Sequence, residues 1–378
     1  METWTEKVNE SGSRSSFRHA CVKQSADQED GPKLGPSRAY SLALAPNLIY
    51  TRSKLLSTLV ASHVHEQIDF QAIGSWFVYE KTPDFEPQGE NKDSGSWFAG
   101  KLGRVPNSRE DVFADPSLSL RAKGALVKFL RFVANYEEKT EEWEAQKDHP
   151  FSVFLASKFK IPADLHGPLM ALTMSTLPPQ QTSTGFAIAR IANHLRSIGL
   201  FGPGFSAVLA KWGGLSEIAQ VGCRAGAVGG SVYILGRSVN SVEAAGPEGA
   251  QEDARSLSVQ LGEGDKVTTT FLVGSDDQLP GSSTTQSPNE SAPTPESSPL
   301  LVSRSISIVS SSLQSLFPAV AEGSPNPAGA VVIFPSNSLQ KEAPDDASAM
   351  PPVHILVHSG DTGECPRGQC KSNTFLLL

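Results

Sequence analysis

The sequence has few of the features that mark secreted, membrane-spanning or nucleic-acid-binding proteins. Its 378 residues include only four cysteines, too few and too scattered for a disulfide framework, which favours a reducing compartment. No apolar run approaches the about 18 residues that a membrane span needs, and no apolar signal segment follows the charged first residues. The net charge of −8, with no concentrated basic face, argues against nucleic acid as the main partner. We therefore expect a cytoplasmic protein.

Motifs of enzymes and of cofactor-binding proteins are also missing. There is no Gly-x-Gly-x-x-Gly, P-loop or nucleophile elbow, so the residues indicate neither dinucleotide binding nor hydrolysis. His63 and His65 are two residues apart, which directs them to different sides of a helix, and no partner acid or cysteine is evident. Cys365 and Cys370 lack a second pair of ligands for zinc. We expect no catalytic, cofactor-binding or metal-binding residues, and no enzyme activity.

Composition divides the chain into packed and unpacked parts. Residues 1–37 mix Ser, Gly, Gln and charges with few large apolar side chains, so we expect a disordered tail. Residues 275–299 are dominated by Ser, Thr, Pro and acids, with no aromatic residue, Lys or Arg, so we expect a disordered inserted loop. The length is typical of about two or three domains, and it allows a sizeable core.

Residues 38–106 are expected to begin a sheet domain. Ile73–Tyr79 alternates like a strand, and 100–105 can pair with it across a polar loop. A helix is expected between Pro46 and this strand. Its lining residues are expected to be Leu48, Leu55, Leu56 and Leu59.

Residues 107–201 are expected to form an all-helical module. Ser108, with an acid three residues on, offers a capping box for a short first helix. Apolar residues then recur at helical spacing, which predicts a packed core on one face of each helix. The longer helices are expected over 120–136, 151–159, 167–177 and 183–200.

The stretch 212–235 has the clearest local pattern. Ser216 can cap a helix that begins at Glu217, whose carboxylate suits the positive end of the helix dipole. Gly229 and Gly230 supply a left-handed end to this helix. The next residues, 231–235, are then expected to form a short buried strand.

The remaining residues predict further strands of the sheet domain. Within 202–274, alternation around the turn at 262–265 predicts a hairpin of 257–261 and 267–273. Within 300–378, strands are expected over 301–309, 330–334 and 353–357. The fold class is therefore mixed α and β, with a sheet domain in several pieces and a second, helical domain.

Three polar residues of the predicted central helix share one stripe. Glu217, Gln220 and Arg224 are spaced i, i+3 and i+7, beside an apolar stripe that starts at Ile218. The acid and the guanidinium are two turns apart, roughly 10 Å along the axis, too far to satisfy each other. Two interpretations stay open: a surface that grips a partner, or ordinary solvated charges without a function.

The stretch 212–235 resembles the family of Rab escort proteins and Rab GDP-dissociation inhibitors. In that family a glutamate, a glutamine three residues on and an arginine seven residues on precede a short tyrosine-containing strand. Glu217, Gln220, Arg224 and Tyr233 occupy those places here. The unit around the first predicted strand pair and the late turn SGDTGECPRGQ are similar to the family as well. The resemblance implies a sheet domain related to FAD-linked reductases (the GDI type) and a helical second domain.

The resemblance also implies a carrier protein without catalysis of its own. Glu217, Gln220 and Arg224 would belong to the platform that binds GDP-bound Rab GTPases. The helical domain would dock the α/β heterodimer of Rab geranylgeranyltransferase and shelter the geranylgeranyl lipid, with transient membrane association during vesicular transport. The long insert and the CPRGQ segment favour an escort protein over a GDP-dissociation inhibitor. A degenerate FAD-dependent oxidoreductase is the alternative from another class.

Two departures from the family pattern are expected. The family begins with a strand, a glycine-rich turn and a helix, which the missing Gly-x-Gly-x-x-Gly places outside this chain. The family also continues past the turn at 365–369 into one more strand, whereas this chain reads CKSNTFLLL there. We interpret the chain as shortened at both ends, with a sheet that exposes a long edge.

Overall fold

The computed structural model divides into two compact units. They are Met1–Gly31 with Ala227–Pro299, and Pro32–Gly226 with Leu300–Leu378. The expected capping box at Ser108 and nearly all of the expected insert lie outside the described residues. The structure describes residues 2–10, 16–23, 34–81, 100–106, 112–113, 116, 118–245, 256–262, 264–275, 279–280, 301–319, 326–339 and 350–377.

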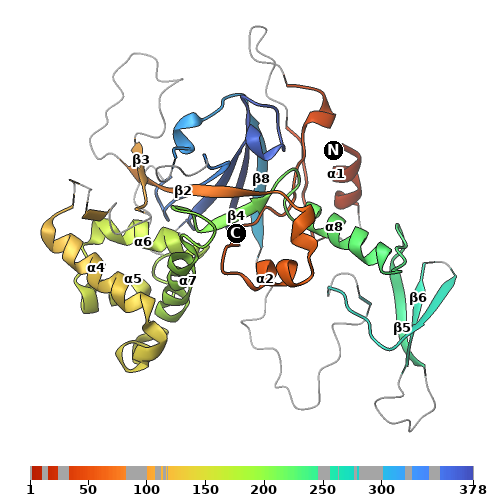
Figure 1. The fold of residues 1–378 in the computed structure, drawn as a ribbon, viewed down its shortest axis with the longest axis horizontal. Coiled ribbons are helices and arrows are strands. Elements are labelled where there is room, and N and C mark those ends of the chain that lie inside the picture. Colours follow the sequence, from red (N-terminus) through yellow and green to blue (C-terminus); the bar gives the residue numbers. More distant parts are fainter. Residues whose placement is uncertain are drawn as a thin grey trace. The chain divides into compact units, whose positions relative to one another are not determined.

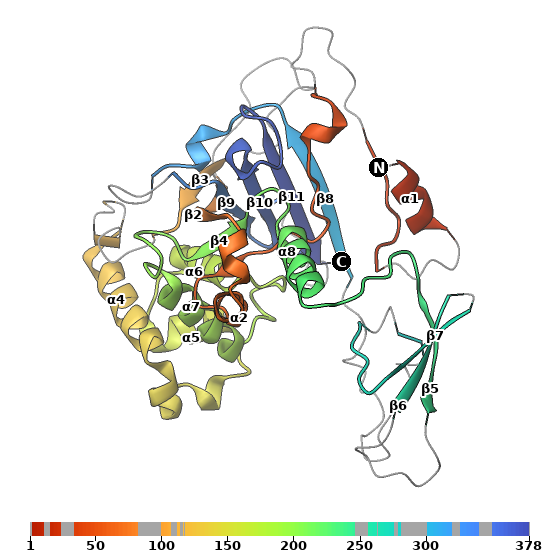
Figure 2. The same ribbon diagram turned by 45° about the vertical axis from the view of Figure 1, so that its right-hand side comes forward.

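The larger unit is organised around one mixed sheet (Figures 1 and 2). Its strand order is β1-β4-β2-β9-β10-β11-β8, with β3 paired to the end of β2. The strands are β1 (Ile49–Tyr50), β2 (Phe70–Lys81), β3 (Gly100–Arg104), β4 (Ala207–Ala210), β8 (Val302–Val309), β9 (Gly329–Phe334), β10 (Val353–Ser359) and β11 (Cys370–Leu377). β2 and β9 run parallel, and the other pairs in this sheet are antiparallel.

β2 is the strand that connects the two halves of the sheet. Its first residues pair with β4, its middle with β9 and its last five with β3. The sequence predicted the pairing of Ile73–Tyr79 with 100–105, and this pairing is confirmed with a longer β2. Because side chains alternate along a strand, Trp76 enters one apolar cluster and Phe77 enters a second cluster on the opposite face of the sheet.

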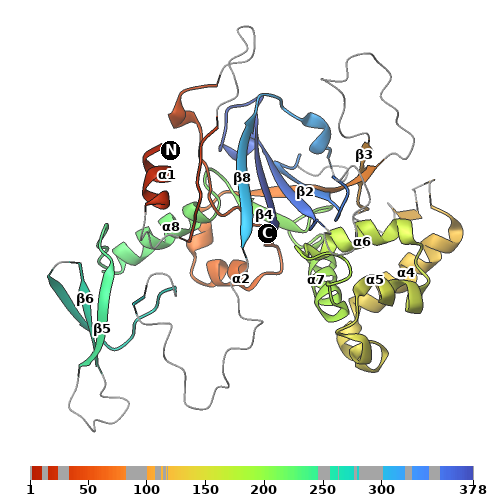
Figure 3. The ribbon, with the colours of Figure 1, turned by 180° about the vertical axis from the view of Figure 1, so that it is seen from behind.

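The helical module lies next to β2 and β3 (Figure 3). Serine side chains start its two long helices: Ser119 accepts from the amide of Ala122, and Ser183 accepts from that of Phe186. The helices are α4 (Leu120–Ala134), α5 (Phe151–Phe154, continued by a π-turn over Leu155–Phe159), α6 (His166–Thr173) and α7 (Thr184–Ser197). The four predicted longer helices are confirmed, with shifted ends.

One apolar cluster joins these helices to the sheet. Trp76 of β2 is fully buried. Its ring and that of His194 of α7 make an edge-to-face contact, with their centroids 4.8 Å apart. Phenylalanine rings from α4 and α5 pack together on the helical side, with Phe129 at 5.3 Å from Phe159. Buried aromatic side chains dominate core energetics, so this cluster fixes the helices against β2. The predicted apolar core of the module is confirmed.

The helix expected after Pro46 is α2, which spans Lys54–Ala61 and is capped by Ser53. Leu56 and Leu59 are buried as expected. Two other expectations were wrong, because Leu48 precedes β1 and Leu55 is exposed.

Two further strand expectations were wrong. The segment CKSNTFLL, interpreted as lacking the family's final strand, forms β11 and pairs with both β10 and β8. Residues 231–235 are irregular rather than a buried strand, with Val232 84% exposed and Leu235 90% exposed. The chain instead re-enters regular structure at β5 (Val239–Ala245).

The smaller unit contains a three-stranded sheet in the order β5-β6-β7. The predicted hairpin is confirmed as β6 (Ser256–Leu261) and β7 (Asp265–Thr269), paired from Leu257↔Thr269 to Leu261↔Asp265. Gly262 lies in this turn at φ +51, a left-handed conformation that favours glycine.

The expected disordered tail, residues 1–37, contains a helix, α1 (Glu2–Asn9). Contacts between this helix and residues 17–20 explain why the segment is ordered. The Asn9 side chain exchanges two hydrogen bonds with the backbone of Ala20, and the rings of Trp4 and Phe17 lie 5.7 Å apart. These contacts fold the two short segments back on each other.

Candidate functional site

Helix α8 (Leu215–Val228) carries the polar stripe that the sequence singled out. A tight turn leads into it from β4, with Trp212 at φ +67 and Gly214 at φ +62. The helix begins before the predicted start at Glu217. Ser216 is therefore not the cap, and its hydroxyl donates to the carbonyl of Gly213 at 2.8 Å. The predicted left-handed end is confirmed at Gly230, at φ +91.

The two faces of α8 differ as predicted. Val221 is buried, and Ile218 packs on a cluster that includes Leu56 and Phe205. Gln220 and Arg224 are exposed and Glu217 is half-buried. The apolar face fixes the helix to the unit, which leaves the polar stripe on its outer side.

Arg224 reaches a neighbouring turn. Its Nη1 lies 3.5 Å from Oε1 of Gln67, in the 3-10 turn Val64–Gln67. The Glu217 carboxylate folds back over Gly213, where Oε1 lies 3.3 Å from the position a Cβ would take. Within the part of the chain that the structure describes, neither charge takes part in an ion pair. Both charges are therefore available to a partner.

Trp212, just before α8, is a residue that sequence reasoning missed. Its ring is 47% exposed, and the Lys211 ammonium lies 4.6 Å from the ring centroid. The amide of Trp212 donates to the carbonyl of Thr362 at 2.7 Å, and Gly363 lies against the ring. Tryptophan is enriched among the residues that contribute most to binding at interfaces, so the half-exposed ring of Trp212 is a candidate contact. The signal in the sequence was a large aromatic residue directly before a glycine pair.

A buried charge network supports the loop under Trp212. The Glu364 carboxylate contacts both the imidazole of His358 and the ammonium of Lys371, and all three side chains are buried. Burial alone would raise the pKa of Glu364, but the hydrogen bonds and charges of His358 and Lys371 hold it below its usual value. The amide of Ser41 also donates to the Glu364 carbonyl at 2.9 Å. These contacts of Glu364 hold in place the loop that carries Gly363.

The side chains considered for metal binding have other contacts. Nδ1 of His63 lies 3.1 Å from Oε1 of Glu66, an exposed acid partner that the sequence analysis did not identify. The thiols of Cys365 and Cys370 donate to backbone carbonyls. Over the described residues, no group of three or more His, Cys, Asp or Glu is placed to hold a metal ion. Likewise, none of their helices has the length and apolarity to span a membrane.

The sequence of this chain is similar to those of known proteins. Residues 10–269 match a family model described as GDI, GDP dissociation inhibitor. Rab proteins geranylgeranyltransferase component A from Saccharomyces cerevisiae is 31% identical over 241 residues, covering 64% of this chain and 36% of that protein. The Candida albicans protein of the same name is 27% identical over 333 residues, covering 88% of this chain and 46% of that protein. This chain thus spans less than half the length of these relatives.

A solved structure has a similar fold. The crystal structure of a Rab GDI from Plasmodium falciparum matches with a TM-score of 0.60 at 16% identity, over 91% of this chain and 69% of that one. This likeness shows the fold alone. The expected GDI-type architecture is confirmed in its coarse form, a mixed sheet with a set of helices.

Proposed function

The chain belongs to the GDP dissociation inhibitor family, and from this premise we propose that it is a Rab escort protein. In this role it binds GDP-bound Rab GTPases and presents them to Rab geranylgeranyltransferase. It then carries the prenylated product to membranes, with a cytoplasmic location and transient membrane association. The names of its relatives, component A of that transferase, support an escort protein over a GDP-dissociation inhibitor. In this proposal the transferase heterodimer does the chemistry, and this chain has no catalytic role.

The observation that supports the proposal best is the polar stripe of α8. Glu217, Gln220 and Arg224 line the outer side of a helix whose other side is anchored by Val221. Neither charge of the stripe has an ion-pair partner in the described part of the chain. An anchored helix presents an acid and a base at a fixed separation, because its backbone does not have to be ordered on binding. We assign the Rab platform to this stripe.

A binding measurement with GDP-loaded Rab tests this assignment. Replacing Glu217 or Arg224 by alanine removes one charge-assisted contact, which is typically worth about 1–3 kcal/mol. We expect the Kd to rise by a factor of about 5 to 150. Matched controls are Glu138→Ala and Arg131→Ala, which remove exposed charges of the same sign from the helical module. Equal affinity of the wild type and both stripe variants would remove the docking role.

A prenylation assay separates the escort role from that of a GDP-dissociation inhibitor. The complete chain is added to purified transferase heterodimer, GDP-loaded Rab and geranylgeranyl diphosphate, and lipid incorporation into Rab is measured. An escort protein increases incorporation in proportion to its concentration. A chain that binds GDP-loaded Rab but leaves incorporation at the background level would instead act as an inhibitor of dissociation.

A further inference from the structure

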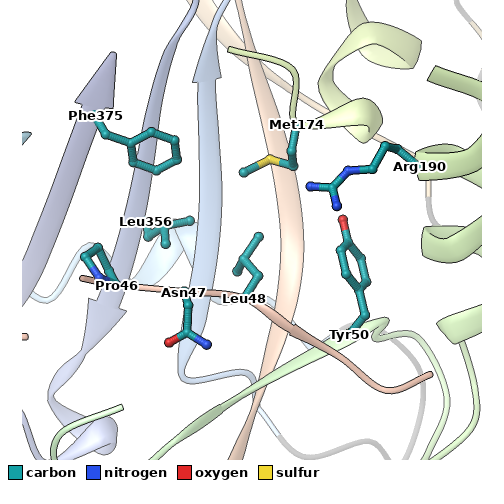
Figure 4. Close-up of a pocket in the computed structure, with 8 residues that line it drawn as sticks. All are labelled: Pro46, Asn47, Leu48, Tyr50, Met174, Arg190, Leu356 and Phe375. Carbon is teal, nitrogen blue, oxygen red and sulfur yellow. The ribbon is translucent and has the colours of Figure 1, made fainter. Parts of the chain in front are cut away.

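A small pocket opens where the sheet meets the helical module, and none of its lining residues belongs to α8 (Figure 4). Its volume is about 230 Å³. It draws residues from β1 and the segment before it, from α7 and the residue after α6, and from β10 and β11. The lining residues are Pro46, Asn47, Leu48, Tyr50, Met174, Arg190, Leu356 and Phe375.

The polar end of the pocket is formed by Arg190 and Tyr50. The Tyr50 hydroxyl points toward the guanidinium of Arg190 (Figure 4). Arg190 donates from Nε to the carbonyl of Thr173 at 3.3 Å and lies over the ring of Phe186, at 5.7 Å from its centroid. Its charge forms no ion pair with the residues that the structure describes. The two Nη groups of Arg190 have no hydrogen-bond partner among the described residues, so they can donate to an anion.

Tyr50 brings a second donor that is buried and unused. Its side chain is only 8% exposed, and its hydroxyl has no hydrogen-bond partner in the described structure. Burial raises the pKa of Tyr50 to about 12, against the opposing charge of Arg190, so the hydroxyl keeps its proton at neutral pH. Folding leaves such a group unpaired only at a cost in free energy. A ligand oxygen placed between Tyr50 and Arg190 would recover that cost.

The remainder of the pocket is apolar. In Figure 4, Leu356 and Phe375 lie on the side away from Arg190, and Leu48 and Met174 lie nearer to it. Phe375 is held from behind by His354, whose ring stacks on it at 5.1 Å, and burial lowers the pKa of His354 to about 4, so that it stays neutral. The pocket lining includes no acidic side chain. An anion that enters therefore meets one positive charge and no opposing negative charge.

Volume limits the size of the ligand. The pocket volume of about 230 Å³ lies below the about 300–1,000 Å³ that is typical of sites for drug-sized ligands, so the ligand is a small molecule. A carboxylate on a short carbon chain is a ligand of this class. One guanidinium balances the single charge of a carboxylate, whereas the second charge of a phosphate monoester would stay uncompensated near Tyr50.

We propose that this pocket binds a small amphipathic acid, with its carboxylate between Arg190 and Tyr50 and a short apolar body against Leu48, Leu356 and Phe375. The site forms no covalent bond with its ligand and does not use the α8 stripe. The pocket and the proposed Rab platform share no residue, so the outcomes of their two tests are distinguishable.

Calorimetric titration of the complete chain with sodium hexanoate tests the proposal. We expect saturable binding to one site, no binding of hexan-1-ol, and weaker binding of hexyl phosphate. Arg190→Gln should weaken hexanoate binding at least tenfold. Arg131→Gln makes the same change at an exposed position of α4 outside the pocket, and should leave the affinity unchanged.

Tyr50→Phe separates a role of the hydroxyl in ligand binding from a role in stability, because the two effects should have opposite signs. Removing the unpaired hydroxyl should raise the urea midpoint of unfolding while it weakens hexanoate binding about five- to tenfold. Absence of saturable binding to the wild type would overturn the proposal, as would equal affinity in Arg190→Gln. Equal binding of hexanol would overturn the role of the charge, and tighter binding of hexyl phosphate would overturn the assignment of a carboxylate.

Discussion

Protonation of the buried His194 should weaken the contact between the sheet and the helical module. The ring is 2% exposed and lies with its plane at 90° to Trp76, with Nδ1 at 3.3 Å from the hydroxyl of Ser206. Burial lowers the pKa of His194 from its usual 6.5 to about 4. The folded protein therefore keeps the ring neutral, whereas the unfolded chain takes up a proton below about pH 6.5.

The sign and size of the effect follow from these two pKa values. A histidine with a lowered pKa stabilises the fold above its unfolded pKa, and this contribution is lost as the pH falls toward the folded pKa. Each pKa unit between the unfolded and folded states corresponds to about 1.36 kcal/mol, so the loss of stability between about pH 6.5 and about pH 4 is about 3 kcal/mol in all. At about pH 5, which lies between these two pKa values, the free energy of unfolding should be about 2 kcal/mol lower than at neutral pH.

Urea unfolding followed by tryptophan fluorescence measures this loss. Between neutral pH and about pH 5, the free energy of unfolding of the wild type should fall by about 2 kcal/mol more than that of His194→Phe. His354 has a lowered pKa as well, but its contribution is the same in both proteins and cancels in the difference. His63→Gln, at an exposed histidine, should behave as the wild type does. The same pH dependence in wild type and His194→Phe would refute the reasoning.

Three other substitutions test the packing. Glu364→Gln leaves Lys371 buried without a carboxylate and should cost about 3–5 kcal/mol of stability in urea unfolding; an unchanged midpoint would contradict the network. Gly124→Ala, in the interior of α4 where an added Cβ meets no atom within 4 Å, should raise stability by about 0.5–1 kcal/mol in the same assay. Gly363→Ala places a Cβ 2.5 Å from the ring of Trp212 at a residue with φ +75, so it should lower the free energy of unfolding by about 1–3 kcal/mol. Because the ring must move, the tryptophan fluorescence emission should shift, and an unchanged emission would contradict this contact.

The helical module and the α8 stripe were predictable because their signals are local. In α4 and α7 apolar residues recur with the period of the helix, and a serine marks each start. The outward direction of Gln220 and Arg224 follows from the same period. Trp212 before its glycine pair was a local signal as well, but how its ring is held was not predictable, because Thr362 and Gly363 lie far along the chain.

The strand errors have a different cause, since they depend on neighbours that the local sequence does not reveal. Residues 231–235 are apolar enough for a buried strand but form none. β11 is the reverse case: Lys371 and Asn373 make it look like a loop, yet both are buried between β10 and β8. Lys371 is tolerated there because Glu364 supplies the compensating charge.

The parallel pairing of β2 with β9 has a consequence for synthesis on the ribosome. Ile73 lies opposite Gly329, so β2 waits for about 250 residues of translation, some tens of seconds at about 5–20 residues per second. During that time one edge of β2 lacks its native neighbour, which invites pairing with other nascent chains. Yield in the cell should therefore respond to chaperone supply and to the speed of elongation.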